Sequence, residues 1–490
     1  MLVLVWVGLL VALVRRPSFV PGSTAGNPAP VVGLVAASES DDTWMGVYMQ
    51  GNKIGYSRQR RIPGSDGYRF EDRSLLRLTV LETAQTVRTS VQGEAGDDHS
   101  LRSFSLSLRS GVGDLRVNGS VREGELRFTV KIGSEVRHEK VALDAPLYLP
   151  STARRHLTSL GFEEGRRTNL EVFDPSAMAN HPMELVVEGR EALPASDGNV
   201  QAWRVRESFR GVESTVWFDE AGRVLREEGP MGLLAIREGA EQATTQGWKE
   251  GAAFDLMAAV AVPVREPIET PRDLDRIELR IKGLKAVLPI SDRRQSYLDG
   301  TLRIVREDAA TLGTYQLPYD GGERQGDLRE TPFLQVNHPR VRSTTAEILG
   351  PETDARRAAV RLRRWVFDRL EKVPTTSIPN ALQVLEMGAG DCNEHAVLWA
   401  ALARAAGLPA RVVAGVVYVD GVFLYHAWNE VWLGSGWVSV DAAFDQMPVD
   451  ATHVKFVEGG PEVHAALIPL LGELSIGVAA VGGDPQAALH

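Results

Sequence analysis

Cysteine is almost absent from this chain of 490 residues, which contains a single one, Cys392. One cysteine excludes an intrachain disulfide and a thiolate metal cluster. The chain also lacks a paired-histidine zinc motif, a Walker loop, a Rossmann fingerprint, an EF-hand loop and a G-x-S-x-G elbow. A net charge of −10 argues against non-specific binding of nucleic acid. The sequence therefore predicts no cofactor, no metal ion and no nucleic-acid partner.

Lysine and arginine are missing ahead of the first apolar run, Leu2 to Val14. The run suits the core of a signal peptide and is short for a membrane span. Small residues around Ala36 offer a cleavage site, whereas Arg15 follows the run and leaves an uncleaved anchor or a misplaced start codon open. We expect an exported protein, periplasmic or membrane-anchored outside the cytoplasm, in which residues 1–40 are signal peptide or anchor plus linker.

Residues 41–250 are expected to form a β-rich domain, because apolar and polar residues alternate in short runs separated by turn pairs. The predicted turns are Gly51-Asn52, Asn118-Gly119, Glu123-Gly124, Gly133-Ser134 and Ala221-Gly222, and a short helix is expected at His156–Gly165. This pattern indicates an antiparallel meander, as a curved sheet or a partial barrel. The histidines of this region match no ligand spacing, and an apolar inner face would suit either a bound lipid or peptide or packing against the rest of the chain.

Residues 251–335 are expected to be a connecting β element, with strands at Asp275–Ile281 and Thr301–Val305. Residues 336–460 carry helical periodicity first and strand periodicity later, which indicates an α+β domain. An amphipathic helix is predicted at Thr353–Glu371, and strands flank a hairpin turn at Asp420-Gly421. Residues 461–490 are expected to be a weakly patterned tail with a short helix at Ala465–Leu474.

The single cysteine lies at the start of a predicted helix. Asp391 and Glu394 have the spacing of a capping box, and strong helix formers follow up to Gly407. The unpaired N–H groups and the macrodipole of the first helical turn favour an anion, so a Cys392 thiolate would be stabilised there. Taken alone, the same pattern also fits a small buried residue.

A thiolate nucleophile needs a base, and the base needs an orienting partner. His426 lies within a predicted strand, and Asp441 ends the next one. A two-residue turn at Gly434-Ser435 would place both on one face, whereas a three-residue turn would separate them. His395 is the other candidate base, but it would project along the helix side. Glu430 shares the parity of His426 and is interpreted as a surface or polar-pair residue.

Four sequence blocks carry a resemblance to a known family. They are Gly390-Asp-Cys-Asn-Glu-His-Ala396, Leu402-Ala-Arg-Ala-Ala-Gly-Leu-Pro-Ala-Arg411, His426-Ala-Trp-Asn-Glu-Val431 and Gly436-Trp-Val-Ser-Val-Asp441. In order and spacing they resemble the papain-like core of the transglutaminase-like superfamily. The resemblance implies Cys392 as nucleophile, His426 as general base and acid, and Asp441 as the residue that orients the imidazole. It also implies structural roles for Trp428 and Trp437, and the chain departs from bacterial members only at Ala442-Ala443.

The implied reaction is acyl transfer from a peptide or amide through a thioester, with the backbone N–H of Cys392 as one oxyanion donor. Water would complete a protease or amidase reaction, and an amine would complete a transglutaminase reaction. No calcium loop is visible, which argues against a calcium-activated crosslinker, and for an exported member of this kind we favour hydrolysis. The alternative is a non-catalytic binding or scaffold protein of the cell envelope that uses its β-rich domain. The fold class expected is α+β, with an antiparallel β-rich domain followed by the transglutaminase-like core.

Overall fold

The structure, a computed structural model, describes residues 41–80, 83–110, 113–132, 135–175, 178–195, 198–245, 261–284, 291–373 and 380–482. These residues divide into two compact units, each described here by itself: unit 1 contains the described residues up to 245, and unit 2 those from 261 onward. The predicted leader and linker, residues 1–40, lie outside the described residues. Among the described residues, no helix is both long enough and apolar enough to cross a bilayer.

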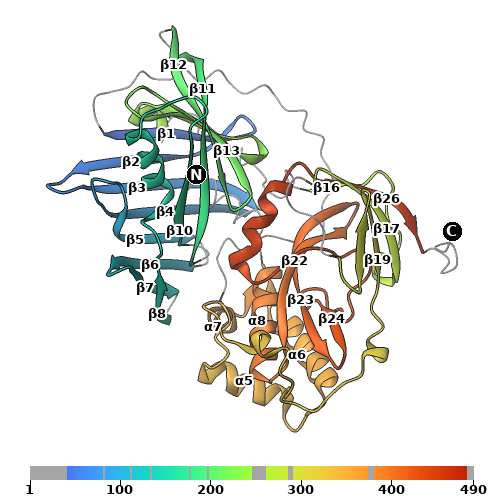
Figure 1. Cartoon of the computed structure of the whole chain (residues 1–490). Helices are drawn as coiled ribbons and strands as arrows, with labels where there is room; N and C mark the ends of the chain where they lie inside the picture. The colour runs from blue at the N-terminus through green and yellow to red at the C-terminus, as the bar shows by residue number, and fades with distance from the viewer. Residues whose placement is uncertain are drawn as a thin grey trace. The chain divides into compact units, whose positions relative to one another are not determined.

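Unit 1 is built on one 15-stranded sheet in which consecutive strands are neighbours, except β8 and β9 at the two ends of the order (Figure 1). The order is β8-β7-β6-β5-β4-β3-β2-β1-β15-β14-β13-β12-β11-β10-β9, and all neighbours are antiparallel except β9 and β10. The strands are β1 (Asp42–Met49), β2 (Asn52–Pro63), β3 (Tyr68–Val80), β4 (Thr83–Ala95), β5 (Leu101–Ser110), β6 (Gly113–Arg122), β7 (Glu125–Ile132), β8 (Glu135–Ala142), β9 (Leu147–Tyr148), β10 (Arg167–Asp174), β11 (Ala179–Ala195), β12 (Gly198–Phe209), β13 (Val212–Phe218), β14 (Val224–Glu228) and β15 (Leu233–Glu238).

The turns of unit 1 agree with the sequence in part. Glu123-Gly124 and Ala221-Gly222 lie between strands as predicted, but the first turn is Gln50-Gly51, because Asn52 already pairs with Met49. The prediction of a turn at Asn118-Gly119 is wrong, since both residues lie inside β6. A side chain on Gly119 would collide with the ring of Phe104, so the glycine makes room for an aromatic neighbour on the sheet. The predicted turn at 133–134 lies outside the described residues.

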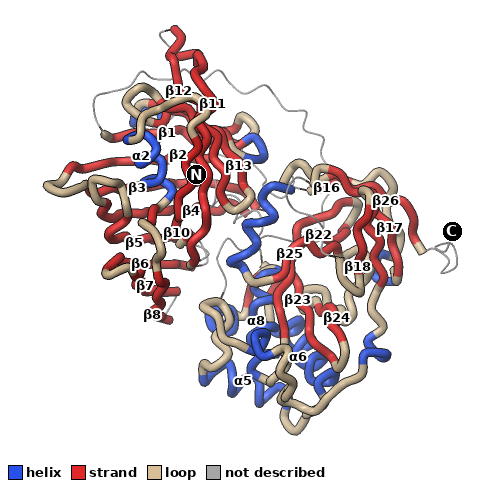
Figure 2. The backbone as a smooth tube through the Cα atoms, in the orientation of Figure 1, coloured by secondary structure: helices blue, strands red, loops and turns tan. Residues whose placement is uncertain are grey.

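Two short helices accompany this sheet, α2 (Pro150–Ser159) and α3 (Ala240–Thr245), together with the 3₁₀ turn η1 (Pro230–Gly232). Figure 2 shows α2 among the strands of unit 1. The helix starts earlier than the predicted His156–Gly165 because Pro150 occupies its first turn, where a missing N–H costs nothing. Its Arg154 is buried and donates to Glu207 of β12 at 2.7 and 2.8 Å and to Glu227 of β14 at 2.9 Å.

The described residues of unit 2 combine helices with two small sheets and the two-stranded pair of β20 (Glu371–Lys372) and β21 (Ala389–Gly390). Its helices are α5 (Pro339–Leu349), α6 (Ala355–Arg369), α7 (Ala381–Met387) and α8 (Cys392–Ala405). One sheet has the order β16-β23-β22-β25, with β24 also paired to β23. Its strands are β16 (Val262–Pro263), β22 (Ala410–Val419), β23 (Val422–Leu433), β24 (Gly436–Val440) and β25 (Val454–Glu458). Residues 392–403 of α8 are all buried, because this helix packs on the sheet and against the other three helices.

The second sheet of unit 2 has the order β18-β19-β17-β26 and joins segments far apart in the chain. Its strands are β17 (Arg276–Lys282), β18 (Gln295–Leu298), β19 (Thr301–Val305) and β26 (Ser475–Val481). Smaller elements are β20 (Glu371–Lys372), β21 (Ala389–Gly390), η2 (Pro271–Asp273), η3 (Ala309–Leu312), η4 (Gln325–Leu328) and η5 (Pro461–Leu470).

The predicted strands at β17 and β19 and the amphipathic helix α6 are therefore confirmed, and the fold class α+β is observed. The tail was expected to be weakly structured, yet β26 pairs with β17. The predicted helix at Ala465–Leu474 is instead the 3₁₀ segment η5, which contains Pro469.

Candidate active site

The start of α8 is fixed by its cap. The Asp391 carboxylate accepts a hydrogen bond from the N–H of Asn393 at 2.9 Å, and Glu394 accepts one from the N–H of Asp391 at 3.0 Å. Gly390 precedes them, and any side chain there would collide with that of Glu394. The predicted capping box is therefore present, and it places Cys392 at the first position of the helix.

The Cys392 side chain is 2% exposed. The Asn393 amide donates to its Sγ across 3.8 Å. At this position the thiol lies at the positive end of a 14-residue helix, where a thiolate is favoured over a thiol more than it would be in a loop.

The strand that carries His426 is paired as the sequence allowed. A two-residue turn joins β23 to β24, with Leu433 opposite Gly436 and Asn429 opposite Val440. The pairing ends at Val440, so Asp441 follows directly after β24 and comes to the His426 side of the sheet. His426 and Asp441 are both 1% exposed, and Nε2 of the imidazole lies 2.7 Å from Oδ2 of the carboxylate.

Asp441 is itself held from the other side. Its Oδ1 accepts hydrogen bonds from the backbone N–H groups of Ala443 at 2.7 Å and Phe444 at 3.1 Å. Burial pushes the pKa of Asp441 upward, but the neighbouring imidazoles, His426 first among them, hold it well below its ordinary value. The carboxylate is therefore ionised and rigid. Because the Asp441 carboxylate accepts the hydrogen bond from Nε2 of His426, Nδ1 is the ring nitrogen left for proton exchange with a thiol.

Strand β23 packs directly on α8, and the Asn429 amide donates to the carbonyl oxygen of Ala396 at 2.9 Å. Thus the helix of Cys392 and the strand of His426 are adjacent. The competing candidate, His395, is held in the helix cap, since its Nδ1 lies 2.6 Å from the carbonyl oxygen of Asp391.

Aromatic rings enclose the His426 imidazole. The Trp428 ring is stacked at 5.9 Å and the Phe444 ring at 5.0 Å, with interplanar angles of 19° and 27°. This restricts the imidazole to one plane. Glu430, interpreted as a surface or polar-pair residue, is a buried partner of Arg411 and Lys455, each at 2.7 Å.

A second histidine, missed in the sequence, completes the cluster. His453 is fully buried, with its Nε2 3.2 Å from Asp441 Oδ2 and its Nδ1 3.3 Å from Asp450 Oδ1. The close spacing of Asp450 and His453 in the sequence is a signal for a polar pair. Their distance from Asp441, however, depends on how the loop before β25 folds back.

Residues 342–442 match the family model described as the transglutaminase-like superfamily. This part of the chain is a transglutaminase-like domain. The match contains the capped helix, His426 and Asp441, whereas His453 lies beyond it.

Individual known proteins also resemble parts of the chain. An uncharacterised protein of Mycobacterium leprae is 29% identical over 157 residues, which are 30% of this chain, and the chain spans 53% of the length of that curated relative. A candidate cysteine protease of Cytophaga hutchinsonii is 19% identical, with 41% of this chain and 83% of that chain covered and a TM-score of 0.29. A β-barrel-like protein of Brucella abortus is 13% identical, with 42% and 97% covered and a TM-score of 0.33. Structural likenesses this low say nothing about activity.

Unit 2 also contains a set of side chains of the kind that can bind a divalent cation. His426, Asp441 and His453 each offer one ligand atom, and these atoms lie within 4.8 Å of one another. Two imidazoles and one carboxylate suit zinc or iron. A cation there would, however, replace the hydrogen bonds that both imidazoles already make to Asp441 Oδ2.

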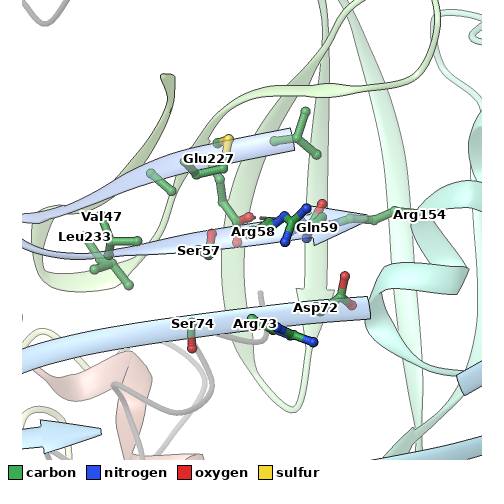
Figure 3. Close-up of a pocket in the computed structure, with 13 residues that line it drawn as sticks. Val47, Ser57, Arg58, Gln59, Asp72, Arg73, Ser74, Arg154, Glu227 and Leu233 are labelled. Atoms are coloured by element: carbon green, nitrogen blue, oxygen red, sulfur yellow. Dashed lines mark hydrogen bonds and ion pairs between the residues drawn. The ribbon is translucent and has the colours of Figure 1, made fainter. Parts of the chain in front are cut away.

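Unit 1 contains a cavity of a different kind (Figure 3). Its floor is apolar, with Val47 and Leu233, and its polar side chains include Arg58, Asp72 and Arg154. Arg58 and Arg154 already pair with acidic partners. Burial raises the pKa of Asp72 to about 6, only partly offset by the nearby Ser151 hydroxyl and the charge of Arg155. The described lining residues include no nucleophile with an adjacent base, so this cavity does not resemble the Cys392 site.

Proposed function

We propose that the protein is a cysteine-dependent acyl-transfer enzyme that hydrolyses peptide or amide bonds through the transglutaminase-like domain. The observation that carries this proposal is the 2.7 Å contact between His426 and Asp441 in the strand that packs on the Cys392 helix. A buried carboxylate on Nε2 fixes the ring and its tautomer and stabilises the imidazolium that forms during acyl transfer.

The reaction begins with a proton on His426 and a thiolate on Cys392. The thiolate attacks the carbonyl carbon, and the backbone N–H of Cys392 donates to the oxyanion that forms. When the C–N bond breaks, His426 gives its Nδ1 proton to the leaving amine, and a thioester remains. His426 then takes a proton from water, the hydroxide attacks the thioester, and the carboxylic acid product and the thiolate separate.

An amine in place of water would make the same site a transamidase. Trapping distinguishes the two outcomes: the full chain is incubated with glutamine-containing peptides in ¹⁸O-water, with and without a primary amine. Mass spectrometry then detects ¹⁸O in a free carboxylate for hydrolysis and the amine adduct for transamidation. We expect ¹⁸O incorporation that is lost in Cys392→Ala, and a predominant amine adduct would replace hydrolysis by transamidation.

Alkylation distinguishes an enzyme from a non-catalytic scaffold. The protein has one cysteine, so iodoacetamide labels one thiol only. We expect fast labelling at pH 6 that falls in His426→Ala, because the imidazolium stabilises the thiolate. Slow labelling that is unchanged in His426→Ala would support the scaffold and overturn the enzyme.

Export belongs to the same proposal, supported by the apolar run from Leu2 to Val14. A peptide or protein in the cell envelope would then be the substrate. Fractionation of cells that express the full chain tests this location, and recovery of the chain in the cytoplasm would contradict it.

A further inference from the structure

His453 is placed to act on the candidate base through the carboxylate that both histidines share. Asp441 Oδ2 lies 2.7 Å from His426 Nε2 and 3.2 Å from His453 Nε2. Oδ1 of the same carboxylate is occupied by two backbone N–H groups. Since an ionised carboxylate only accepts hydrogen bonds, each Nε2 must carry a proton.

The other ring nitrogen of His453 also faces a carboxylate, because Nδ1 lies 3.3 Å from Asp450 Oδ1. A neutral imidazole could donate to only one of the two carboxylates and would turn a lone pair toward the other. Both contacts are favourable only when the ring carries two protons. Burial lowers the pKa of His453, but Asp450 and Asp441 outweigh it and the net direction is upward.

Asp450 is built to remain an anion. It accepts hydrogen bonds from the Thr452 N–H at 2.9 Å, the Thr452 hydroxyl at 2.6 Å and the Gln446 amide at 2.9 Å. Gln446 in turn exchanges two backbone hydrogen bonds with Asp441, at 2.9 and 3.0 Å. One closed loop therefore holds both carboxylates on either side of the His453 ring.

Other charges around this loop are already paired. Arg294 donates to the backbone carbonyl oxygens of Asp450 and His453 and pairs with Glu307 at 2.6 Å. Lys455, two residues after His453, pairs with Glu430 and Asp292. Among the described residues, the titratable groups that face the ring are Asp441 and Asp450, with the His426 imidazole 5.7 Å away between ring centroids.

We propose that His453 is a positioning residue, an imidazolium that shares Asp441 with His426 and so lowers the proton affinity of the candidate base. This rests on the proposed function. With its charge divided between two imidazoles, Asp441 stabilises protonated His426 less than an unshared carboxylate would. His426 then releases its proton to a leaving amine more readily, and the added positive charge also favours the Cys392 thiolate.

The direction of the effect can be worked out. A nearby cation lowers the pKa of a thiol and that of an imidazolium, so its removal raises both. A partly screened charge at the 5.7 Å that separates the ring centroids of His453 and His426 shifts a pKa on the order of one pH unit. His453→Gln keeps an N–H donor for Asp441 and removes the positive charge. The apparent pKa values of the Cys392 thiol and of the His426 imidazolium should therefore both rise.

The experiment measures the alkylation rate of Cys392 by iodoacetamide from pH 4 to pH 10 in the full chain, with folding checked by circular dichroism. We expect His453→Gln to raise the apparent thiolate pKa on the order of one unit, which slows labelling roughly tenfold below that pKa. Asp450→Asn should move it in the same direction, because His453 then loses the carboxylate that holds its second proton and becomes neutral. His464→Gln is the control, since His464 is equally buried and neutral, with a pKa lowered to about 4, and should leave the profile unmoved.

The outcomes separate this inference from the proposed function. If the wild-type alkylation rate follows the pH profile of an ordinary thiol and His426→Ala does not change it, both the inference and the proposed function are overturned. A low thiolate pKa that depends on His426 but not on His453 overturns the role of His453 alone. If His453→Gln and Asp450→Asn do not fold, ¹⁵N shifts of the wild-type histidines decide, and a neutral His453 at pH 7.5 overturns the proposal. Purified protein that contains one zinc ion per chain, and whose labelling rate changes when the zinc is chelated, would also overturn the proposal.

Discussion

Both units contain buried networks of charged side chains, but the two networks differ in composition and surroundings. In unit 1, Arg154 lies between Glu207 and Glu227, and all its strong contacts are to groups that neutralise it. In unit 2, Asp441 lies between His426 and His453, and His426 belongs to the strand that packs on the Cys392 helix. Burial of ionisable groups is therefore no sign of a reactive site by itself. Under the function proposed above, the unit 2 network supplies a base for a nucleophile on a neighbouring element, whereas the unit 1 network neutralises a buried cation.

The largest effect is expected where that network is broken in unit 2. Asp441→Asn presents an amide to two Nε2–H groups that need an acceptor, which disturbs the tautomer and orientation of His426. We expect acyl transfer to fall on the order of 10³- to 10⁴-fold, measured as peptide hydrolysis at saturating substrate. Asp420→Asn, in the β22–β23 turn where φ is +46°, is the matched control and should retain activity. Equal activity in both variants would remove Asp441 from the mechanism.

The corresponding substitution in the buried network of unit 1 is Arg154→Met. It leaves Glu207 and Glu227 buried without their cation, so we expect a loss of about 3–5 kcal/mol in the unfolding free energy of unit 1. Hydrogen exchange followed by mass spectrometry on β12 and β14 measures this, and alkylation of Cys392 should not change. Arg102→Met removes an exposed pair with Asp66 and should cost less than about 1 kcal/mol. Similar losses in the two variants would refute the role given to the buried network.

A smaller effect concerns the carboxyl of Asp72 in the unit 1 cavity. Its folded-state pKa of about 6 lies above its ordinary value, so the folded state binds more protons and stability falls as the pH rises from about 4 to 6. Asp72→Asn removes the cost of burying that charge. We expect it to stabilise unit 1 on the order of 2 kcal/mol at pH 7.5 and to have little effect at pH 4.

Thermal unfolding at the two pH values, with hydrogen exchange on β3 to identify unit 1, measures this gain. Asp97→Asn changes the same charge at an exposed position and should show no such pH dependence. A destabilising Asp72→Asn at pH 7.5 would mean that the carboxylate is needed in the fold.

The smallest expected effect is on the cap of α8. Asp391→Ala removes the acceptor for the Asn393 N–H and should destabilise unit 2 by about 1 kcal/mol, whereas Asp391→Ser retains an acceptor and most of the stability. Chemical denaturation of the full chain, followed by hydrogen exchange on α8, checks this. Equal stability of the two variants would show that the capping bond is dispensable.

Much of unit 2 could be predicted because its signals are local. The capping box and the run of helix formers determine α8, and the two-residue turn at Gly434-Ser435 determines the register of β23 and β24, after which Asp441 meets His426. Unit 1 was less predictable in detail. An Asn-Gly pair is a strong turn signal, yet Asn118 and Gly119 are extended because the ring of Phe104 needs the space over Gly119.

By itself the sequence determined the α+β class, the capped cysteine and the order in which His426 and Asp441 follow it, because these depend on spacings of a few residues. Only the tertiary structure decided that His453 shares Asp441 and that β26 closes a sheet begun nearly two hundred residues earlier with β17. Such pairings depend on where whole loops and strands pack. The free energy that selects them comes from burial and hydrogen bonding among distant segments, which leaves no period or motif in the chain.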